Sequence, residues 1–244
     1  MSISERQSEI LNIIKERVYV SVNELASLTF TSPSSIRRDL TALQNLRLVK
    51  RSYGGVTLTE ATDRVAGFYS RASQNIKEKR IIAQKASALL RDGQSILLDS
   101  STTAGFMIPY IAKLDSPIVF TNNLETAISA IREGIKTHCI GGASVNNSVS
   151  LTGSQTYKAL LDISVDIVFF SSQSLDKDGL ISDSTEEENF VRQIMLGRAK
   201  TSVFLCDSEK IGRKSLYKLA SLDDVDFAVL GTNFEELTTR ATVL

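Results

Sequence analysis

A short polar and basic run near the N-terminus has the residue types of a helix that reads DNA. The run Ser32–Leu40 (SPSSIRRDL) opens with a serine, whose hydroxyl can accept a hydrogen bond from an amide of the first helical turn. The proline that follows suits the first helical position, where no N–H is needed. The isoleucine and leucine lie four residues apart and form one apolar face, which leaves Arg37 and Arg38 to point elsewhere. A capped helix with two arginines has the shape that enters a major groove.

Arginine can bond guanine through two acceptors or clamp a phosphate, so we expect at least one of Arg37 and Arg38 to contact DNA. The other arginine can instead pair with Asp39 or Glu24. Short serines can approach base edges, and basic residues on a following hairpin can reach phosphates. The predicted DNA contacts are Ser32, Ser34, Ser35, Arg37, Arg38, Lys50 and Arg51. A solvated helix held by a salt bridge is the alternative.

A second set of polar residues follows the apolar runs of the remaining chain. Asp99–Thr103 (DSSTT) places four hydroxyls and a carboxylate between a strand and a helix, where amides and hydroxyls form a ready anion site. Gly141–Gly142 would let the backbone approach a ligand closely. Asp207–Lys210 (DSEK) ends on a lysine that can reach a phosphate. These runs predict an anion site, and ordinary turns are the alternative.

Several other kinds of site have little support in the sequence. Neither GxGxxG nor a GK[ST] loop occurs, which disfavours dinucleotide and ATP binding. Cys139 and Cys206 lie in apolar runs and are expected in the cores of strands. The single histidine, His138, lies inside a predicted strand and is expected to be structural as well. We therefore predict no metal, no cofactor and no catalytic residues. Neither a signal peptide nor a membrane span is apparent, so we expect a soluble, cytoplasmic protein.

The elements that would position the basic run form a small domain over residues 1–58. Helical patterns are predicted over 4–17, 22–28 and 33–46, with a short edge strand at 18–20. Residues 48–58 alternate around Gly54–Gly55 and predict a β-hairpin wing. Three short helices and a hairpin make a winged helix-turn-helix. This segment has eight lysines and arginines against five acids, a net charge of +3, so the remainder carries −3. A basic head on an acidic body fits nucleic-acid contact by the head alone.

The rest of the chain reads as an α/β domain. Residues 59–75 form a polar linker, and residues 76–244 alternate short β-branched runs with helical ones, which predicts a mostly parallel sheet covered on both faces. Strands are expected at 95–99, 117–121, 136–140, 166–170, 201–206 and 226–230. Helices are expected at 80–90, 107–112, 124–131, 157–161 and 185–199. Ligands of such sheets bind at the carboxyl ends of the strands, where the polar loops lie.

The head resembles the DeoR family of bacterial transcriptional repressors. Such proteins usually show a Val-Ser-x-x-Thr-Ile-Arg-Arg-Asp-Leu run and a His-Gly-Gly wing. Thr31, Ser35 and Tyr53 here replace the valine, the threonine and the histidine, whereas Ile36–Leu40 (IRRDL) is intact. The resemblance implies that the partner is double-stranded DNA, and it adds Tyr53 to the predicted contacts.

The body resembles the effector domain of the same family, which is similar to sugar-phosphate isomerase folds and typically binds phosphorylated sugars. The family's Asp-Ser-Gly-Thr-Thr, Gly-Gly, Glu-Ala-x-x-Lys and Asp-Ser-x-Lys patterns map onto this chain. They imply an effector site formed by Asp99, Ser100, Ser101, Thr102, Thr103, Gly141, Gly142, Glu188, Arg192 and Lys210. Ser101 replaces a glycine, Arg192 replaces a lysine, Ser171–Ser172 replaces a Gly-Ala type loop, and Gly231–Thr232 lacks the usual Thr-Asp.

The leading hypothesis is a repressor of sugar-metabolism genes that a phosphorylated sugar releases from DNA and that works as a dimer or tetramer. A sugar-phosphate isomerase with a DNA-binding head is the enzymatic alternative. It would need a carboxylate or histidine as proton shuttle, for which Asp99, Glu188 and Asp207 are candidates by type only. A third alternative is an oligomeric DNA-binding protein that responds to no effector.

Overall fold

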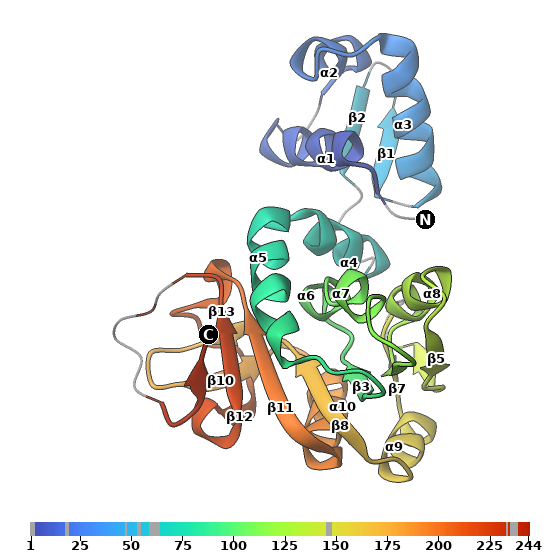
Figure 1. Cartoon of the computed structure of the whole chain (residues 1–244). Helices are drawn as coiled ribbons and strands as arrows, with labels where there is room; N and C mark the ends of the chain where they lie inside the picture. Colours follow the sequence, from blue (N-terminus) through green and yellow to red (C-terminus); the bar gives the residue numbers. More distant parts are fainter. Residues whose placement is uncertain are drawn as a thin grey trace. The chain divides into compact units, whose positions relative to one another are not determined.

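The computed structural model describes residues 3–17, 20–46, 48–52, 55–58, 64–144, 148–232, 234 and 239–244. The chain divides into two compact units, one of residues 1–74 with 146–148 and one of residues 75–145 with 149–244. Each unit is described by itself below (Figure 1).

The first unit contains the predicted winged helix-turn-helix. Its helices are α1 (Glu5–Arg17), α2 (Val22–Leu28) and α3 (Pro33–Asn45), and its hairpin consists of antiparallel strands β1 (Val49–Ser52) and β2 (Gly55–Leu58). Ser21 and Glu24 form a capping box on α2, and the Ser32 hydroxyl accepts a hydrogen bond from the Ser35 amide at the start of α3. Of the edge strand expected at 18–20, Val20 forms a β-bridge with Val56, and residues 18–19 lie outside the described residues. The fully buried apolar side chains of its core are Ile10, Ile14, Val20, Leu25, Ile36, Leu40, Leu43 and Val56.

The segment predicted as a linker contains a further helix, α4 (Arg64–Ser73), which belongs to the first unit. Residues 59–63 lie outside the described residues. Phe68 and Tyr69 on α4 are buried and meet edge to face, with their ring centroids 5.8 Å apart. Burial of these two aromatic rings explains why a segment that also contains several polar residues is helical.

The second unit is built on the expected parallel sheet. Its seven strands lie in the order β14-β13-β11-β8-β3-β4-β5, and every neighbouring pair is parallel. The strands are β3 (Ser95–Leu98), β4 (Ile118–Thr121), β5 (Lys136–Cys139), β8 (Val165–Phe170), β11 (Ala199–Cys206), β13 (Phe227–Leu230) and β14 (Thr242–Val243). The predicted strands are confirmed to within a few residues.

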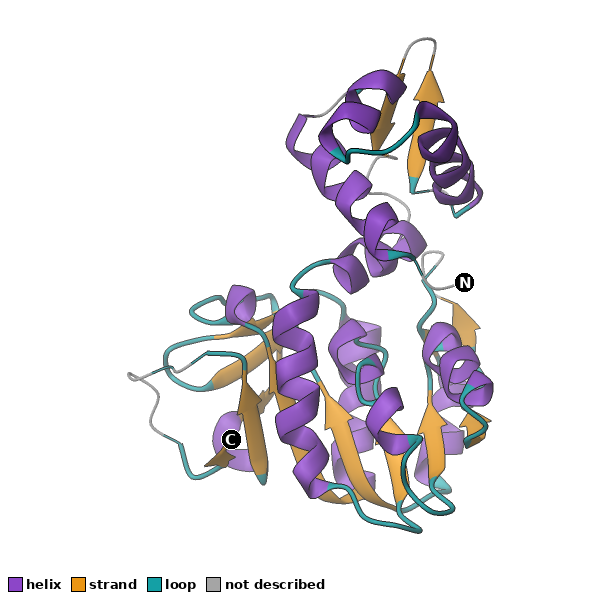
Figure 2. Ribbon diagram, turned by 45° about the horizontal axis from the view of Figure 1, so that its top comes forward, coloured by secondary structure: helices purple, strands orange, loops and turns teal. Residues whose placement is uncertain are grey.

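Helices cover both faces of this sheet (Figure 2). Because side chains alternate along a strand, Ile96 and Leu98 of β3 pack with α5, α6, α7 and α8, whereas Leu97 packs with α9 and α10. These helices are α5 (Ile76–Ala86), α6 (Thr102–Gly105), α7 (Ile108–Ile111), α8 (Leu124–Arg132), α9 (Ser154–Leu161) and α10 (Glu186–Arg198), with short 3-10 turns at Ser87–Leu89, Ser208–Lys210 and Leu222–Asp224.

Two small antiparallel sheets were not predicted. One has the strand order β12-β10-β9, formed by β9 (Ser174–Leu175), β10 (Leu180–Asp183) and β12 (Tyr217–Ser221). The other pairs β6 (Ala143–Ser144) with β7 (Leu151–Thr152). Their strands are two to five residues long and rich in serine, so they lack the β-branched runs from which strands were predicted.

The expectation for one cysteine was wrong. Cys206 is buried in β11, as expected, and burial raises the pKa of its thiol to about 12. Cys139 is exposed, because β5 lies at the edge of the sheet and pairs only with β4 among the described strands. His138, on the same strand, is also exposed, with its ring stacked 4.7 Å from that of Phe120.

Candidate DNA-binding and effector sites

The start of α3 presents the predicted DNA-contacting residues to solvent. The Ser32 hydroxyl lies 2.9 Å from the Ser34 hydroxyl and 3.0 Å from that of Ser35, so the three serines cluster at the first turn. Arg37 and Arg38 are exposed, and within the described parts of the chain neither makes an ion pair. Both guanidinium groups are thus available to an external anion.

The two acids considered as partners for these arginines are engaged elsewhere. The buried Asp39 accepts hydrogen bonds from Arg6 at 2.6 Å and from Gln7 at 3.2 Å, which ties α3 to α1. The hydrogen bond and the charge of Asp39 raise the pKa of Arg6 above its usual value. Glu24 pairs with Arg17 at 3.0 Å. The suggested pairing of Arg37 or Arg38 with Asp39 or Glu24 is therefore wrong.

The wing carries two exposed basic residues on β1. Lys50 and Arg51 both face solvent, and Arg51 donates a hydrogen bond of 3.4 Å to the Thr41 hydroxyl on α3. That bond places one cation of the wing beside the predicted recognition helix. Tyr53 lies outside the described residues.

In the second unit the predicted effector residues gather at the carboxyl ends of the strands. Asp99–Ser101 connects β3 to α6, which begins with Thr102 and Thr103, Ser171 follows β8, and Asp207–Lys210 follows β11. From β3 the chain adds β4 and β5 on one side of the strand. It then crosses to the other side, where it adds β8, so the strand order reverses between β3 and β8. Open α/β sheets bind ligands in the crevice at such a point.

The carboxylate of Asp99 is fully buried and is held by the protein itself. It accepts hydrogen bonds from the Ser101 amide at 3.1 Å, from the Ser101 hydroxyl and from the Ser171 amide at 3.3 Å. Arg192 Nε pairs with it at 2.7 Å. The hydroxyl of Ser101, which stands where a glycine was expected, also caps α6 by accepting a bond from the Ala104 amide at 3.1 Å.

Arg192 is the centre of a buried charge network. Its Nη1 pairs with Asp183 at 2.9 Å, and Glu188, one turn earlier on α10, lies 3.9 Å from its Nη2. Burial lowers the pKa of the guanidinium, but the charges of Asp183, Asp99 and Glu188 outweigh burial and raise it. Asp99 and Arg192 therefore face one another, and the structure brings both to the loop without leaving either open to solvent.

Two lysine side chains contact the hydroxyls of Thr102 and Thr103 at the start of α6. Lys210 Nζ donates to Thr103 Oγ1 at 3.2 Å and to Ser171 Oγ at 2.8 Å, and it pairs with Asp207 at 2.9 Å. Lys79 on α5 is buried, and its Nζ donates to Thr102 Oγ1 at 3.3 Å. Two ammonium groups thus contact the hydroxyls of neighbouring residues.

Lys79 was missed from the sequence, although a signal was there. The buried residues of α5 are Lys79, Ile82, Ala83 and Ala86, which lie at i, i+3, i+4 and i+7. A lysine at a core position of an amphipathic helix needs a polar partner, because burying its charge alone is costly. Asn123 was also missed; it caps α8 and donates a hydrogen bond of 3.0 Å to the Ser100 carbonyl.

The glycine pair after β5 has a packing role. Gly142 has φ +147°, and a Cβ there would lie 2.7 Å from the Thr152 carbonyl and would overlap the Thr156 hydroxyl. The Gly141 carbonyl accepts a hydrogen bond of 2.7 Å from that same hydroxyl. The glycines therefore allow the backbone to pack closely against β7 and α9. Among the interactions of the described residues, Gly141 and Gly142 contact no other predicted effector residue.

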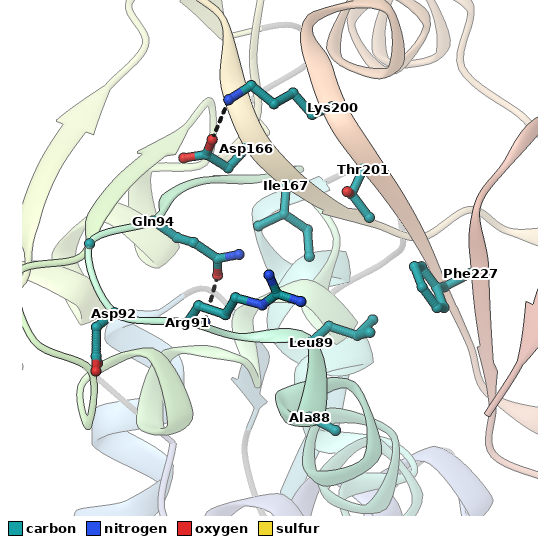
Figure 3. A pocket seen from close by; sticks show the side chains of 11 residues that line it. Ala88, Leu89, Arg91, Asp92, Gln94, Asp166, Ile167, Lys200, Thr201 and Phe227 are labelled. Atoms are coloured by element: carbon teal, nitrogen blue, oxygen red, sulfur yellow. Dashed lines mark hydrogen bonds and ion pairs between the residues drawn. The ribbon is translucent and has the colours of Figure 1, made fainter.

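An open pocket of about 580 Å³ lies at the opposite, amino ends of the strands and shares no lining residue with the predicted effector set. Figure 3 shows the pocket, with the ion pair between Lys200 and Asp166 at its edge. No group of three or more potential metal ligands occurs in the described ranges. None of the described helices is long and apolar enough to cross a membrane.

Family models match both units. The model of the DeoR-like helix-turn-helix domain matches residues 6–62, and that of the DeoR C-terminal sensor domain matches residues 74–232. The chain belongs to the DeoR family. It is a DNA-binding transcription regulator with a C-terminal sensor domain, and the resemblance of both segments is confirmed.

Several curated proteins are similar over nearly the whole chain. The transcriptional regulator YulB of Bacillus subtilis is 28% identical over 99% of this chain and 93% of its own length. The lactose phosphotransferase system repressor of Streptococcus mutans is 30% identical over 91% of this chain and 90% of its own. A solved ribose-5-phosphate isomerase in complex with phospho-erythronic acid aligns with 56% of this chain and 54% of its own at 15% identity, with a TM-score of 0.43.

Proposed function

We propose that this DeoR-family regulator is a cytoplasmic repressor of sugar-metabolism genes and that a phosphorylated sugar releases it from DNA. Relatives named for such regulation support the proposal. Besides the lactose phosphotransferase system repressor, they include a glycerol-3-phosphate regulon repressor of Haemophilus influenzae, which is 24% identical over 95% of this chain and 90% of its own length.

The observation that carries the proposal is that two lysine ammonium groups contact two neighbouring threonine hydroxyls. Lys79 contacts Thr102 and Lys210 contacts Thr103, at the point of the sheet where ligands of this architecture bind. A phosphate group carries up to two negative charges and accepts several hydrogen bonds. Two ammonium groups, two threonine hydroxyls and the amides of a short turn match it in charge and in hydrogen bonding. The phosphate end of the effector lies there.

The other predicted effector residues divide by the partners that they have within the fold. Asp99 and Arg192 are positioning residues, since each is held by buried protein partners. Their network fixes the loops after β3 and β8 and so the spacing of the hydroxyls. Ser100, Thr102, Thr103 and Lys210 contact the phosphate, and the partly exposed Glu188 can accept a hydrogen bond from a sugar hydroxyl.

The same contacts favour sensing over catalysis. Sugar-phosphate isomerisation requires a carboxylate or another base beside the reacting carbons. Asp99 is engaged by Arg192, Asp207 is engaged by Lys210 at 2.9 Å, and Glu188 lies 3.9 Å from the Arg192 guanidinium. We therefore assign the body no catalytic residue, and the isomerase alternative is the weaker one.

On the DNA side, the serine cluster and both arginines of α3 enter the major groove, and the basic wing holds phosphates. The DNA-contacting residues in this proposal are Ser32, Ser34, Ser35, Arg37, Arg38, Lys50, Arg51 and Tyr53. A dimer or tetramer on repeated half-sites supplies the specificity that one winged helix lacks.

The test couples DNA binding to ligand binding. An operator duplex selected from a random library is labelled, and its binding is followed by fluorescence anisotropy with phosphorylated sugars, the parent sugars and inorganic phosphate. A phosphorylated sugar should release the wild-type protein. Lys210→Ala should bind the operator normally yet resist release, whereas Lys158→Ala, an exposed lysine on α9, should behave as wild type. A Lys210→Ala protein that is released at the wild-type ligand concentration would contradict the proposed site.

A further inference from the structure

Helix α8 has two apolar faces, of which only one is used by the fold. Thr126, Ala127 and Ala130 point into the unit and are buried. Leu124, Ile128 and Ile131 lie at i, i+4 and i+7 and keep 40%, 41% and 61% of their surface exposed. That spacing places the three side chains in one stripe along the helix. A second apolar stripe on a surface helix marks an interaction surface.

Charged residues at the two ends of α8 complement one another. Glu125 is in the first turn and Arg132 in the last turn. They are seven residues apart, so they lie on the same flank of the exposed stripe, about 20° from each other at 100° per residue. Arg132 is exposed and makes no ion pair within the described parts of the chain. One flank of the stripe therefore has an acid at its start and a base at its end.

Such a helix is complementary to itself when it is turned end for end. In an antiparallel pair about a two-fold axis, the same flanks of both helices meet. With Ile128 near the axis, Leu124 meets Ile131 of the second copy, and Glu125 meets Arg132 of the second copy twice over. We propose that α8 pairs with α8 of a second copy of this chain in antiparallel orientation. The apolar stripe gives the affinity, and the two ion pairs select the orientation.

The edge of the sheet beside this helix supports the same assignment. α8 packs on β5, the exposed edge strand, so both elements stand at one end of the sheet (Figure 1). An unpaired strand edge is normally protected by a neighbouring segment or a partner chain. A second copy on α8 shields this edge without requiring strand-to-strand pairing.

Sedimentation of the full chain without DNA or ligand tests the proposal, so its failure is distinguishable from a failure of the proposed function. Ile128→Asp should raise the dissociation constant of the oligomer at least about tenfold, because it places a charge at the centre of the apolar contact. Leu161→Asp on α9, at a side chain 56% exposed, is the matched control and should leave it unchanged.

Charge reversal keeps the test decisive should Ile128→Asp fold poorly. Glu125→Arg and Arg132→Glu should each weaken association, and the double reversal should restore it. The assignment would be overturned if Leu161→Asp dissociated the oligomer and Ile128→Asp did not. It would also be overturned if the double-reversal variant associated as weakly as the two single variants. A wild-type chain that is monomeric at micromolar concentration would overturn it too.

A second inference comes from the turn of the helix-turn-helix. Helix α2 ends in a Schellman arrangement: the Phe30 amide donates to the Ser27 carbonyl at 3.4 Å and the Thr31 amide donates to the Ala26 carbonyl at 2.9 Å. Phe30 therefore occupies the left-handed position, with φ +50°. Glycine is the usual residue there, because a Cβ disfavours this conformation.

The ring of Phe30 receives no compensating burial, since the residue is 96% exposed. It also lies two residues before the Ser32 cap of α3, beside the serines proposed to approach DNA. Strained backbone is a mark of functional positions. We infer that the Phe30 ring contacts DNA, packing on a thymine methyl or a deoxyribose at the edge of the groove, as apolar side chains do. This inference rests on the DNA-binding role of the head.

Glycine and alanine substitutions at Phe30 test whether its ring contacts DNA. Phe30→Gly should raise the unfolding temperature by relieving strain, yet lower operator affinity at least about fivefold. Phe30→Ala should lower affinity similarly with no gain in stability, because it keeps the Cβ. Ser116→Gly, at φ +52° in the second unit, is the control and should change stability only.

The two readouts are independent, so each result is informative. Phe30→Gly with greater stability and unchanged operator affinity would overturn the contact. If the wild-type protein binds no selected duplex, the proposed DNA-binding role of the head is wrong, and the Phe30 contact is overturned with it.

Discussion

At the scale of single residues, the two units treat their arginines in opposite ways. Arg37 and Arg38 are exposed and have no acidic partner among the described residues, whereas Arg192 is buried between Asp99 and Asp183. A free guanidinium can reach a guanine or a phosphate, and a buried one orders the loops around it. The same residue type is therefore proposed to bind DNA in the head, whereas in the body it orders buried loops.

The exposed pair yields a prediction for the head. Arg37→Ala or Arg38→Ala should weaken operator binding by about 1–3 kcal/mol where the contact is bidentate to a base. Neither substitution should change the unfolding temperature, since neither side chain has a folded-state partner among the described residues. Anisotropy titrations at fixed salt measure the first effect and calorimetry the second. Normal operator binding by both variants would mean that α3 is not the recognition helix.

The buried arginine yields the opposite prediction. Arg192→Met leaves Asp99 and Asp183 without a counter-charge and should destabilise the protein by about 3–5 kcal/mol, the usual cost of breaking a buried pair. Arg192→Lys keeps the charge but lacks the fork that spans both acids, so its loss should be smaller. Urea unfolding at neutral pH measures both. Equal losses in the two variants would show that geometry, rather than charge, is what Arg192 supplies.

At the scale of elements, one device joins the strands at their amino ends. Ser95 donates its amide and hydroxyl to Asp166 at 3.0 and 2.6 Å, which clamps β3 to β8. Ser202 donates in the same way to Asp226, both at 2.8 Å, and couples β11 to the start of β13. Parallel neighbours are thus fixed in register at the end of the sheet away from the effector loops.

The first clamp makes stability depend on pH. The hydrogen bond from Lys200 and those from Ser95 lower the pKa of Asp166. A lowered pKa means that the stabilisation is complete above the unfolded value of about 3.9 and is lost as pH falls through the lower folded value. Asp166→Asn should therefore reduce stability at pH 7 and flatten its decline on acidification. Urea midpoints at pH 7 and pH 3 measure this, and parallel declines in both proteins would contradict it.

Elements with strong local signals could be predicted from the sequence. Capping serines located α2 and α3, and β-branched runs located β3, β4, β8 and β11. Helix α4 and strands β9, β10 and β12 were missed because tertiary packing stabilises them more than local pattern does. At the site, the loop ends were predictable from strand order, but the pairing of Arg192 with both Asp99 and Asp183 was not, since these residues meet only in the folded chain.

At the scale of the whole molecule, DNA binding and effector binding belong to different units, so regulation must couple them. A ligand changes DNA affinity only by as much as it prefers one arrangement of the protein over another. Coupling of this kind is reciprocal: if a phosphorylated sugar lowers operator affinity by some factor, the operator must lower sugar-phosphate affinity by the same factor. Calorimetric titration of the sugar phosphate, with and without saturating operator, should give that factor independently of the anisotropy measurement.

Lys210→Ala makes the coupling argument discriminating. Loss of one ammonium group should weaken sugar-phosphate binding in both titrations, while the ratio between them stays at the wild-type value, because Lys210 contacts Thr103, Ser171 and Asp207, all in the second unit. A ratio that collapses to one would make Lys210 part of the switch itself rather than of the phosphate contact. Equal sugar-phosphate affinity with and without operator in the wild-type protein would leave a ligand that binds without regulating, and the effector-independent alternative would then hold.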